Sequence, residues 1–114
     1  MSSTNPLIIG SITINSGGNG STIQGLTVNG NINLYANNCS IYGNIIYANE
    51  TSGIITSNSF NNTIFNNTIT SNGYDGILSN SSSNTLHDNN IYGCEYGVYS
   101  ENSEDNITSN NLIK

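Results

Sequence analysis

The sequence is poor in charge, and above all in positive charge. Its 114 residues include one Lys or Arg against seven Asp or Glu, for a formal net charge of -6 at pH 7. Proteins bind nucleic-acid backbones by neutralising phosphates with Lys and Arg, so we exclude nucleic acid as a partner. Disordered chains are usually rich in charge and proline. The single Pro and the 7% of charged residues therefore argue against disorder.

Long apolar runs are also missing. No stretch approaches the roughly 20 residues that a membrane-spanning helix needs, so we expect no membrane span. Met1 to Gly10 has neither the charged start nor the apolar centre of a signal peptide, and we expect that no signal peptide is present in this chain. With 34% apolar residues, the chain is long enough for one domain with a thin core.

Side chains that carry catalysis or bind metals are few. The chain has one His and two Cys, and its acidic residues are scattered. His87 and Asp88 are neighbours, and neighbouring residues of a strand point to opposite faces, so we do not expect them to act together. We therefore predict no catalytic residue, no metal site and no cofactor, and leave open only weak calcium binding at carboxylates in turns.

Asn is abundant, with 24 copies, and much of it belongs to a repeat. Residues 40–46, 63–69, 85–91 and 106–112 align without gaps as aliphatic, two variable residues, Asn, one variable residue, aliphatic, and residues 22–28 are a weaker copy. By subtraction, the first aliphatic residues are 18, 23, 22 and 21 residues apart: Ile23, Ile41, Ile64, Leu86 and Ile107. A second motif, Gly-aliphatic, begins at Gly53, Gly76 and Gly97. Short β-prone pieces at this period are typical of a solenoid.

The repeat predicts an all-β fold, a parallel β-solenoid of about five coils with about 18–23 residues in each coil. We assign residues 11–114 to a single solenoid domain without a clear C-terminal cap, and residues 1–10 to a short N-terminal segment. One inward aliphatic residue per strand stacks on its equivalents in the coils above and below. The expected columns are Ile23, Ile41, Ile64, Leu86 and Ile107; Val28, Ile46, Ile69, Ile91 and Leu112; and Ile12, Ile32, Ile54, Ile77 and Val98.

One Asn per coil occupies the same position of the repeat, where a bend joins two strands. Side-chain amides stacked at the strand spacing of about 4.8 Å can bond to one another and to backbone groups that the bend leaves unpaired. We therefore predict an internal structural ladder, with a polar binding track as the alternative. Its members are Asn44, Asn67, Asn89 and Asn110.

The segments that read NNTI and GI resemble the repeats of right-handed parallel β-helices of the pectate-lyase-like superfamily. They are most similar to the Asn-rich repeats of archaeal cell-surface and adhesin-like proteins and of periplasmic copper-processing β-helix proteins. The resemblance covers about Ile12 to Lys114. It implies a right-handed coil and an extracellular or cell-surface location.

The resemblance also implies which residues an enzyme would need. Polysaccharide lyases of the superfamily use Asp-bound calcium and an Arg or Lys base, whereas this chain has no Arg and its only Lys is Lys114. The hydrolases need clustered carboxylates with a nearby His, and the carboxylates here are scattered. We therefore do not expect an enzyme.

The two cysteines, Cys39 and Cys94, fall in different columns two coils apart. Two coils are about 9.6 Å of rise, whereas the Cα atoms of a disulfide lie within about 7 Å of each other. We expect free thiols or links between molecules rather than an internal disulfide.

Two sets of surface residues are candidates for contact or modification. An outward stripe is expected to contact a neighbouring molecule or a sugar, or to be ordinary surface: Tyr42, Phe65, His87, Ile55, Leu78 and Tyr99. Seven Asn-x-Ser/Thr triplets are candidates for glycosylation: Asn19, Asn38, Asn49, Asn61, Asn66, Asn80 and Asn106.

The ends of the repeat suggest a function. Neither end offers the helix or polar cap that normally covers a terminal coil. The chain is therefore either an excised piece of a longer repeat protein or a subunit that stacks on copies of itself. We predict the second: a non-catalytic structural protein that associates with itself end to end or laterally, in a filament, sheath, surface layer or adhesin stalk. A carbohydrate-binding module and a fragment of a polysaccharide-active enzyme are the alternatives.

Overall fold

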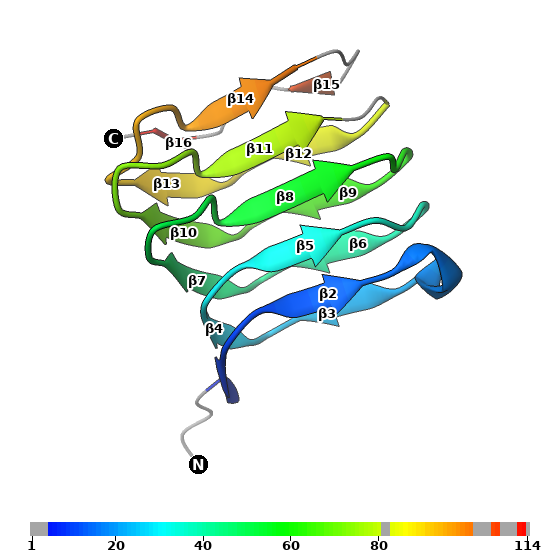
Figure 1. Cartoon of the computed structure of the whole chain (residues 1–114), viewed down its shortest axis with the longest axis horizontal. Coiled ribbons are helices and arrows are strands. Elements are labelled where there is room, and N and C mark those ends of the chain that lie inside the picture. The colour runs from blue at the N-terminus through cyan, green and yellow to red at the C-terminus, as the bar shows by residue number, and fades with distance from the viewer. Residues whose placement is uncertain (1–4, 81–82, 102–105, 108–111, 114) are drawn as a thin grey trace.

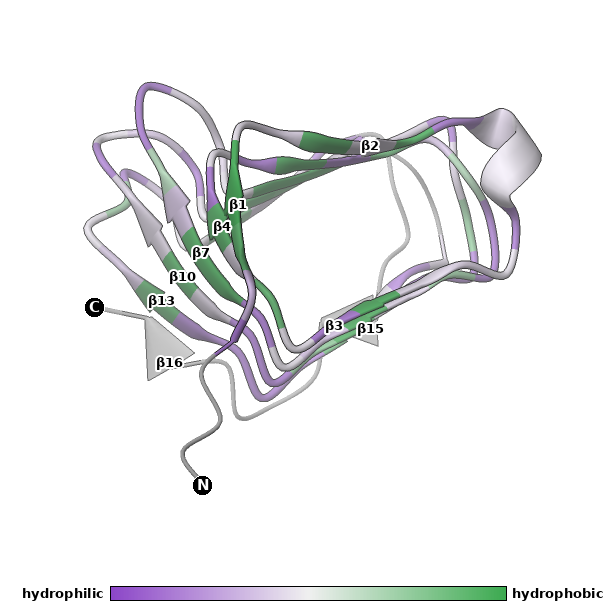
Figure 2. Ribbon diagram, turned by 90° about the horizontal axis from the view of Figure 1, so that it is seen from below, coloured by the Kyte–Doolittle hydropathy of each residue, from purple (hydrophilic) through white to green (hydrophobic). Residues whose placement is uncertain are grey.

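The computed structural model describes residues 5–80, 83–101, 106–107 and 112–113. Within them the chain winds through three parallel sheets, one on each side of a roughly triangular coil (Figures 1 and 2). Apart from one 3₁₀ turn, η1 (Ser16–Gly18), the described elements are strands of two to four residues. The all-β parallel solenoid predicted from the repeat is confirmed.

We call the three sheets A, B and C. Sheet A contains β1 (Leu7–Ile9), β4 (Thr27–Asn29), β7 (Ile45–Ala48), β10 (Thr68–Ser71), β13 (Asn90–Tyr92) and β16 (Leu112–Ile113). Sheet B contains β2 (Ile12–Ile14), β5 (Ile32–Leu34), β8 (Ile54–Ser57), β11 (Ile77–Asn80) and β14 (Val98–Ser100). Sheet C contains β3 (Thr22–Gln24), β6 (Ser40–Tyr42), β9 (Thr63–Phe65), β12 (Thr85–His87) and β15 (Asn106–Ile107). Strand β1 belongs to sheet A although it lies within the first ten residues, which the sequence had not assigned to the solenoid.

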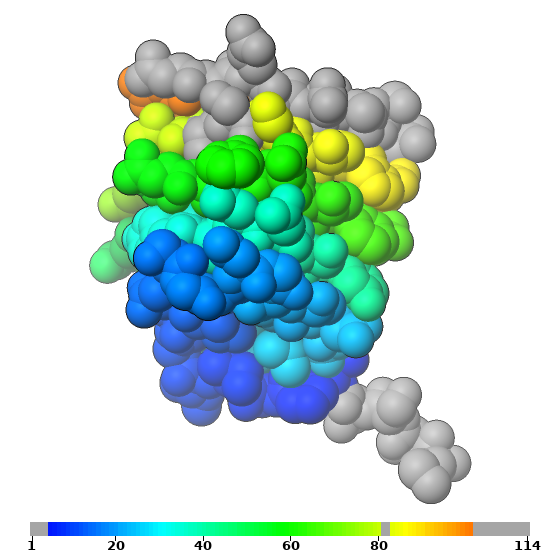
Figure 3. Space-filling model, turned by 90° about the vertical axis from the view of Figure 1, so that its right-hand side faces the viewer, coloured from blue at the N-terminus to red at the C-terminus, as the bar shows by residue number. Residues whose placement is uncertain are grey.

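Each strand pairs with its equivalents in the coils before and after it, so the coils follow one another in chain order along the stack (Figure 3). The registers of sheets B and C are those predicted from the repeat. In sheet A the prediction was wrong at the end of the column. Ile113 pairs with Ile91, and Leu112 pairs with Asn90. The repeat had assigned the column position opposite Ile91 to Leu112, which comes one residue before the true partner, Ile113.

The core is the stack of inward aliphatic residues, and the hydrophobic positions recur on the strands of successive coils in Figure 2. Because each inward side chain is covered above and below, very few apolar residues are enough to exclude water. The fully buried members are Val28, Ile32, Leu34, Ile41, Ile46, Ile54, Ile64, Ile69, Ile77, Leu86 and Ile91. Each such side chain contributes about 1.5–3 kcal/mol through burial.

The glycine of each Gly-aliphatic motif lies just before a strand of sheet B, where the chain passes close to the coil above. A Cβ at Gly76 would lie 2.3 Å from Ile91 Cγ2 and 2.6 Å from the Gly97 carbonyl oxygen. A Cβ at Gly53 would lie 2.4 Å from Ile69 Cγ2. The motif therefore recurs because a side chain at this position would clash.

Two sharp bends flank sheet C. At the C–A bend, which leads from sheet C to sheet A, one residue per coil has a positive φ: Gly25, Gly43, Asn66 and Asp88, at 68°, 67°, 54° and 56°. At the B–C bend, which enters sheet C, the same role falls to Asn38, Asn61 and Ser83, at 58°, 59° and 64°. Gly and Asn suit this left-handed conformation better than other residues do.

Candidate functional site

The strongest candidate site lies on the outer face of sheet C, where three ring side chains stack in register. The rings of Tyr42 and Phe65 are 4.8 Å apart at 13°, and those of Phe65 and His87 are 5.0 Å apart at 7°. We call Tyr42, Phe65 and His87 the ring column. Parallel strands place the outward residues of successive coils directly over one another, and the stacked rings cover one another's faces.

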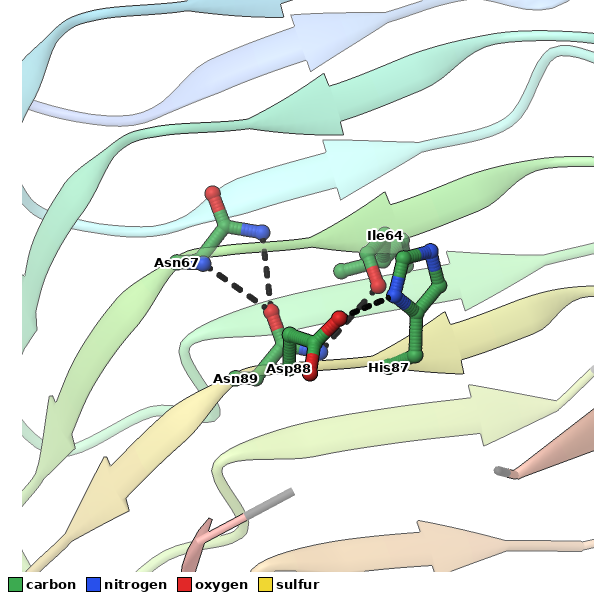
Figure 4. A network of polar contacts seen from close by, with 5 residues as sticks. All are labelled: Ile64, Asn67, His87, Asp88 and Asn89. Atoms are coloured by element: carbon green, nitrogen blue, oxygen red, sulfur yellow. Dashed lines mark hydrogen bonds and ion pairs between the residues drawn. The ribbon is translucent and has the colours of Figure 1, made fainter. Parts of the chain in front are cut away.

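His87 contacts the residue that follows it, which the sequence did not predict. Its Nδ1 lies 2.7 Å from Asp88 Oδ2 (Figure 4). We had expected the two side chains on opposite faces, as in a continuous strand. Strand β12 ends at His87, however, and the positive φ of Asp88 turns the chain so that the carboxylate swings back to the imidazole. An Asp at a left-handed position directly after a strand residue was the signal for this pair.

The His87–Asp88 pair resembles part of a catalytic or metal site, but the other residues of such a site are missing from the described part of the chain. A carboxylate that accepts from Nδ1 fixes the orientation of the ring and leaves Nε2 as the atom able to bind a proton or a metal. Both side chains are partly exposed, at 33% and 41%. In the part of the chain that the structure describes, no group of three His, Cys, Asp or Glu residues could hold a metal ion. The geometry therefore provides an oriented imidazole and nothing further.

The predicted Asn ladder runs inside the coil, directly behind this pair. Asn67 Oδ1 accepts from the backbone N–H and the amide of Asn44, and Asn89 Oδ1 accepts the same two bonds from Asn67 (Figure 4). The amides also donate to strand carbonyls, Asn67 Nδ2 to Ile41 O and Asn89 Nδ2 to Ile64 O. These three Asn are buried, so the ladder is internal rather than a surface track. Asn110 lies outside the described residues.

A second, shorter column at the B–C bend was not predicted. Asn62 Oδ1 accepts from the backbone N–H of Cys39, and Asn84 Oδ1 accepts from that of Asn62. The repeat form hid this column because Cys39 stands where an Asn would begin it. The doubled Asn-Asn of NNTIFNNT was the available signal. At each of the two bends the first Asn has positive φ and the second is buried.

The Asn-Asn pairs at these bends are also the first two residues of two of the glycosylation triplets. In Asn61-Asn62-Thr63 and Asn66-Asn67-Thr68, the exposed first Asn makes the bend and the Thr opens the next strand. The six candidates with described side chains are all exposed or nearly so: Asn19, Asn38, Asn49, Asn61, Asn66 and Asn80. The side chain of Asn106 lies outside the described part. Glycosylation stays a prediction, and the bends already require three of these residues, Asn38, Asn61 and Asn66.

The two cysteines are free and lie at different corners of the coil. Cys39 is 1% exposed, and its Sγ lies within 3.5 Å of the carbonyl oxygens of Gly18 and Asn37. Cys94 is half-buried in the turn from sheet A to sheet B. Burial, and to a smaller extent the charge of Asp75, raises the pKa of the Cys94 thiol, against the effect of a backbone hydrogen bond at Ser71. A thiol with a raised pKa is a poor nucleophile, and Cys39 could link two molecules only after a local opening.

The turns from sheet A to sheet B carry the remaining candidate chemistry. From β7 onward they have five residues, 49–53, 72–76 and 93–97, and they protrude beyond the shorter first turns (Figure 2). Burial raises the pKa of Asp75, and the neighbouring Glu95 raises it further. Tyr74 and Tyr96 are about half exposed. These turns therefore present carboxylates and tyrosines to solvent.

The second half of the predicted contact stripe lies on the outer face of sheet B. Ile55, Leu78 and Tyr99 are in register on β8, β11 and β14. Tyr99 also contacts Tyr96, with ring centroids 5.5 Å apart. The predicted stripe is thus two separate columns on two faces of the coil, and its role in contacts stays a prediction.

In a comparison with protein families, residues 3–114 match a model described as "Periplasmic copper-binding protein (NosD)". Searches of curated proteins and of solved structures returned no match. Among the described residues there is no helix long and apolar enough to cross a membrane.

The family description implies copper, so the donors of this chain must be tested against it. Copper binds best to imidazole, thiolate and thioether ligands. Here the imidazole of His87 lies on the outer face of sheet C, Cys39 is buried at the B–C bend, and Cys94 is in a turn between sheets A and B. These donors do not converge, and the residues present do not fit a copper site.

Proposed function

This chain belongs to the NosD family of periplasmic copper-binding proteins, and from that premise we propose that it is a non-catalytic structural β-helix that associates end to end with copies of itself. The assembly would be a filament, sheath, surface layer or adhesin stalk. The periplasmic description of the family is consistent with a location in the cell envelope or outside the cell. Placement at the cell surface is part of our proposal.

The observation that carries this proposal is the state of the first coil. Ile12 and Ile14 point inward like Ile32 and Leu34 in the next coil, with which they pair. Ile32 and Leu34 are 0% exposed, whereas Ile12 and Ile14 are only half-buried. Among the described residues, no coil covers their lower faces in the way that a neighbouring coil covers those of every interior coil. A further coil placed there would complete their burial.

The backbone at the same end can accept such a coil. Strands β1, β2 and β3 are end strands of their sheets, and no described strand pairs with their outer edges. In β2 the Ile12 N–H and the Ile14 carbonyl bond to the coil above. Because N–H groups alternate in direction along a strand, Thr13 directs its N–H to the free edge. Unpaired edges of this kind are templates for strand addition.

Charge gives the contact a direction. No Asp, Glu, Lys, Arg or His occurs before Glu50, so the first coil is uncharged, whereas all seven acidic residues lie between Glu50 and Asp105. A head-to-tail contact brings an uncharged end to an acidic one, whereas a tail-to-tail contact would bring like charges together. Head-to-tail contacts are heterologous and generate open chains or rings.

Electron microscopy and light scattering of the purified chain test the proposal. We expect fibres or rings and a particle mass that rises with concentration. Thr13→Pro removes only the N–H that faces the free edge, so it should shorten or abolish the assemblies while the chain stays folded. Thr13→Ala keeps that N–H and serves as the matched control. A stable monomer at high concentration would rule out self-assembly.

A second candidate function is glycan binding, and the exposed tyrosines favour it. Tyr74, Tyr96 and Tyr99 are 49%, 52% and 39% exposed, and Tyr74 and Tyr96 are sequence neighbours of Asp75 and Glu95 in the turns. Aromatic faces with nearby acceptors suit uncharged sugars rather than uronic acids, because the chain is acidic. Binding on a glycan array that Tyr96→Ala abolishes and Tyr47→Ala preserves would support this function. Turnover of uronic-acid polymers would contradict both candidates.

A further inference from the structure

We infer that this chain has no copper site of its own, so that it shares the fold of its family without the binding property for which the family is described. The inference is independent of self-assembly. It rests on the number of suitable donors, on where the fold places them and on the state of the single imidazole.

The whole chain contains few donors that copper prefers. It has one His, two Cys and one Met. Soft thiolate and thioether ligands select Cu⁺, and imidazole suits Cu²⁺. A site of high affinity needs at least two such ligands at bonding distance from one ion. The chain could assemble one only by bringing several of these four residues together.

The solenoid keeps the described donors apart. Cys39 lies inside the coil at the B–C bend, and its backbone bonds to Asn62 and Thr63 at the start of β9 rather than near β13. Cys94 follows β13, two coils further along, in a turn at another corner. His87 projects from the outer face of sheet C. Because each strand is held by its neighbours in both directions, no local hinge can bring these positions together.

The surroundings of each donor add to this separation. Cys39 is 1% exposed and directs its thiol to carbonyl oxygens. Asp88 is hydrogen-bonded to Nδ1 of His87, which leaves Nε2 as the only imidazole nitrogen able to bind a metal. Carboxylates do not supply the missing ligands, because no group of three His, Cys, Asp or Glu residues exists in the part of the chain that is described. Copper can therefore attach only through single, exchangeable bonds.

Competition for copper tests the inference. The reduced protein is mixed with Cu⁺, and separately with Cu²⁺, and an equimolar small-molecule chelator of the same ion is added before gel filtration. We expect all of the copper to leave with the chelator. Without chelator, Cu²⁺ should give an electron paramagnetic resonance spectrum with coupling to a single nitrogen.

Two variants identify the donor. His87→Phe keeps a ring on Phe65 but removes the nitrogens, so it should abolish the nitrogen coupling, and Cys94→Ser should change nothing. Thermal unfolding checks that both variants fold. Retention of one copper per wild-type chain against the chelator would overturn the inference, and so would nitrogen coupling that survives in His87→Phe.

Discussion

The two bends beside sheet C are built in the same way, but only the C–A bend carries a complete series of hydrogen bonds between Asn amides. At both bends a residue with positive φ precedes a residue that pairs with the next coil. At the C–A bend, Asn44, Asn67 and Asn89 form an uninterrupted series of amide hydrogen bonds. At the B–C bend the series begins at Cys39, and the buried Nδ2 of Asn62 has no hydrogen-bond partner among the described residues.

The difference shows that an Asn ladder stabilises the fold where its amide nitrogens have partners. An amide in the middle of a complete column both accepts and donates toward the adjacent coils, so its polar atoms are satisfied although it is buried. At the B–C bend the amide nitrogen of Asn62 has no such partner in the described part of the chain. The neighbouring Cys39 does not explain this, because Asn44, which stacks on Leu26, keeps its amide bonds to Ile23 O and Asn67 Oδ1. Because an unpaired buried polar group costs about 1–3 kcal/mol, a broken column should contribute much less than a complete one.

The largest expected effect follows from breaking the complete column. Asn67→Ala removes the acceptor of the Asn44 N–H and amide and the donor to Ile41 O. Several buried groups lose partners at once, so we expect the free energy of unfolding to fall by about 3–5 kcal/mol. Chemical denaturation followed by circular dichroism measures this loss. A loss below about 1 kcal/mol would show that the ladder is not a main source of stability.

The equivalent substitution in the incomplete column should cost less. Asn62→Ala leaves the Cys39 N–H without its acceptor but also removes the unpaired amide nitrogen. We expect a loss of about 1–2 kcal/mol in the same denaturation experiment. The comparison between the two columns fails if Asn62→Ala is as destabilising as Asn67→Ala.

The bend residues themselves should contribute about equally on the two sides of sheet C. Asn61 and Asn66 are exposed and have positive φ, a conformation that costs most L-residues about 1–2 kcal/mol. We expect Asn61→Ala and Asn66→Ala each to lower stability by about 1 kcal/mol, and the Gly variants to be neutral. Unequal losses would mean that side-chain contacts, and not backbone strain, decide these positions.

The smallest effect concerns the third corner, where side-chain hydrogen bonds join Ser11, Asn31 and Thr51 but no series of Asn amides runs through the described coils. Burial and Glu95 raise the pKa of Asp75 above its ordinary value of 3.8, so the fold disfavours its ionised form. Stability is therefore lost as the pH rises from below that value through the raised pKa. Asp75→Asn should be slightly more stable than the wild type near pH 7 and equal to it near pH 2.

Thermal unfolding at the two pH values measures this difference. Glu95→Gln, which removes only the smaller cause, is the matched variant and should stabilise less. A destabilised Asp75→Asn near pH 7 would show instead that the carboxylate makes a favourable contact in the fold.

The sequence predicted the solenoid and most of its register because residues at equivalent positions of the repeat stack on one another in the fold. Each strand pairs with its own equivalent, so residues that align in the sequence are neighbours in space. The prediction was wrong at Leu112, where nothing in the pattern reveals a one-residue shift. It missed the Cys39 column for a related reason, since a Cys in place of an Asn does not match the form of the repeat.

The candidate site was less predictable than the fold. The His87–Asp88 contact depends on the φ of one residue, and strand alternation gave the opposite expectation. The stacking of His87 on Phe65 followed from the register, and so did the separate column of Ile55, Leu78 and Tyr99. Side-chain contacts across a bend depend on how sharply the chain turns, which the spacing of aliphatic residues does not report.

The sequence by itself determined that this protein is a stack of short parallel strands, because one aliphatic residue per strand can form a core only by stacking on its equivalents. Only the tertiary structure decided which polar side chains meet. It placed the Asn amides in one complete and one broken column, and it joined His87 to Asp88. It also placed the two cysteines at corners of the coil away from His87. Backbone pairing follows from a local pattern, whereas the convergence of side chains depends on where each bend directs the chain.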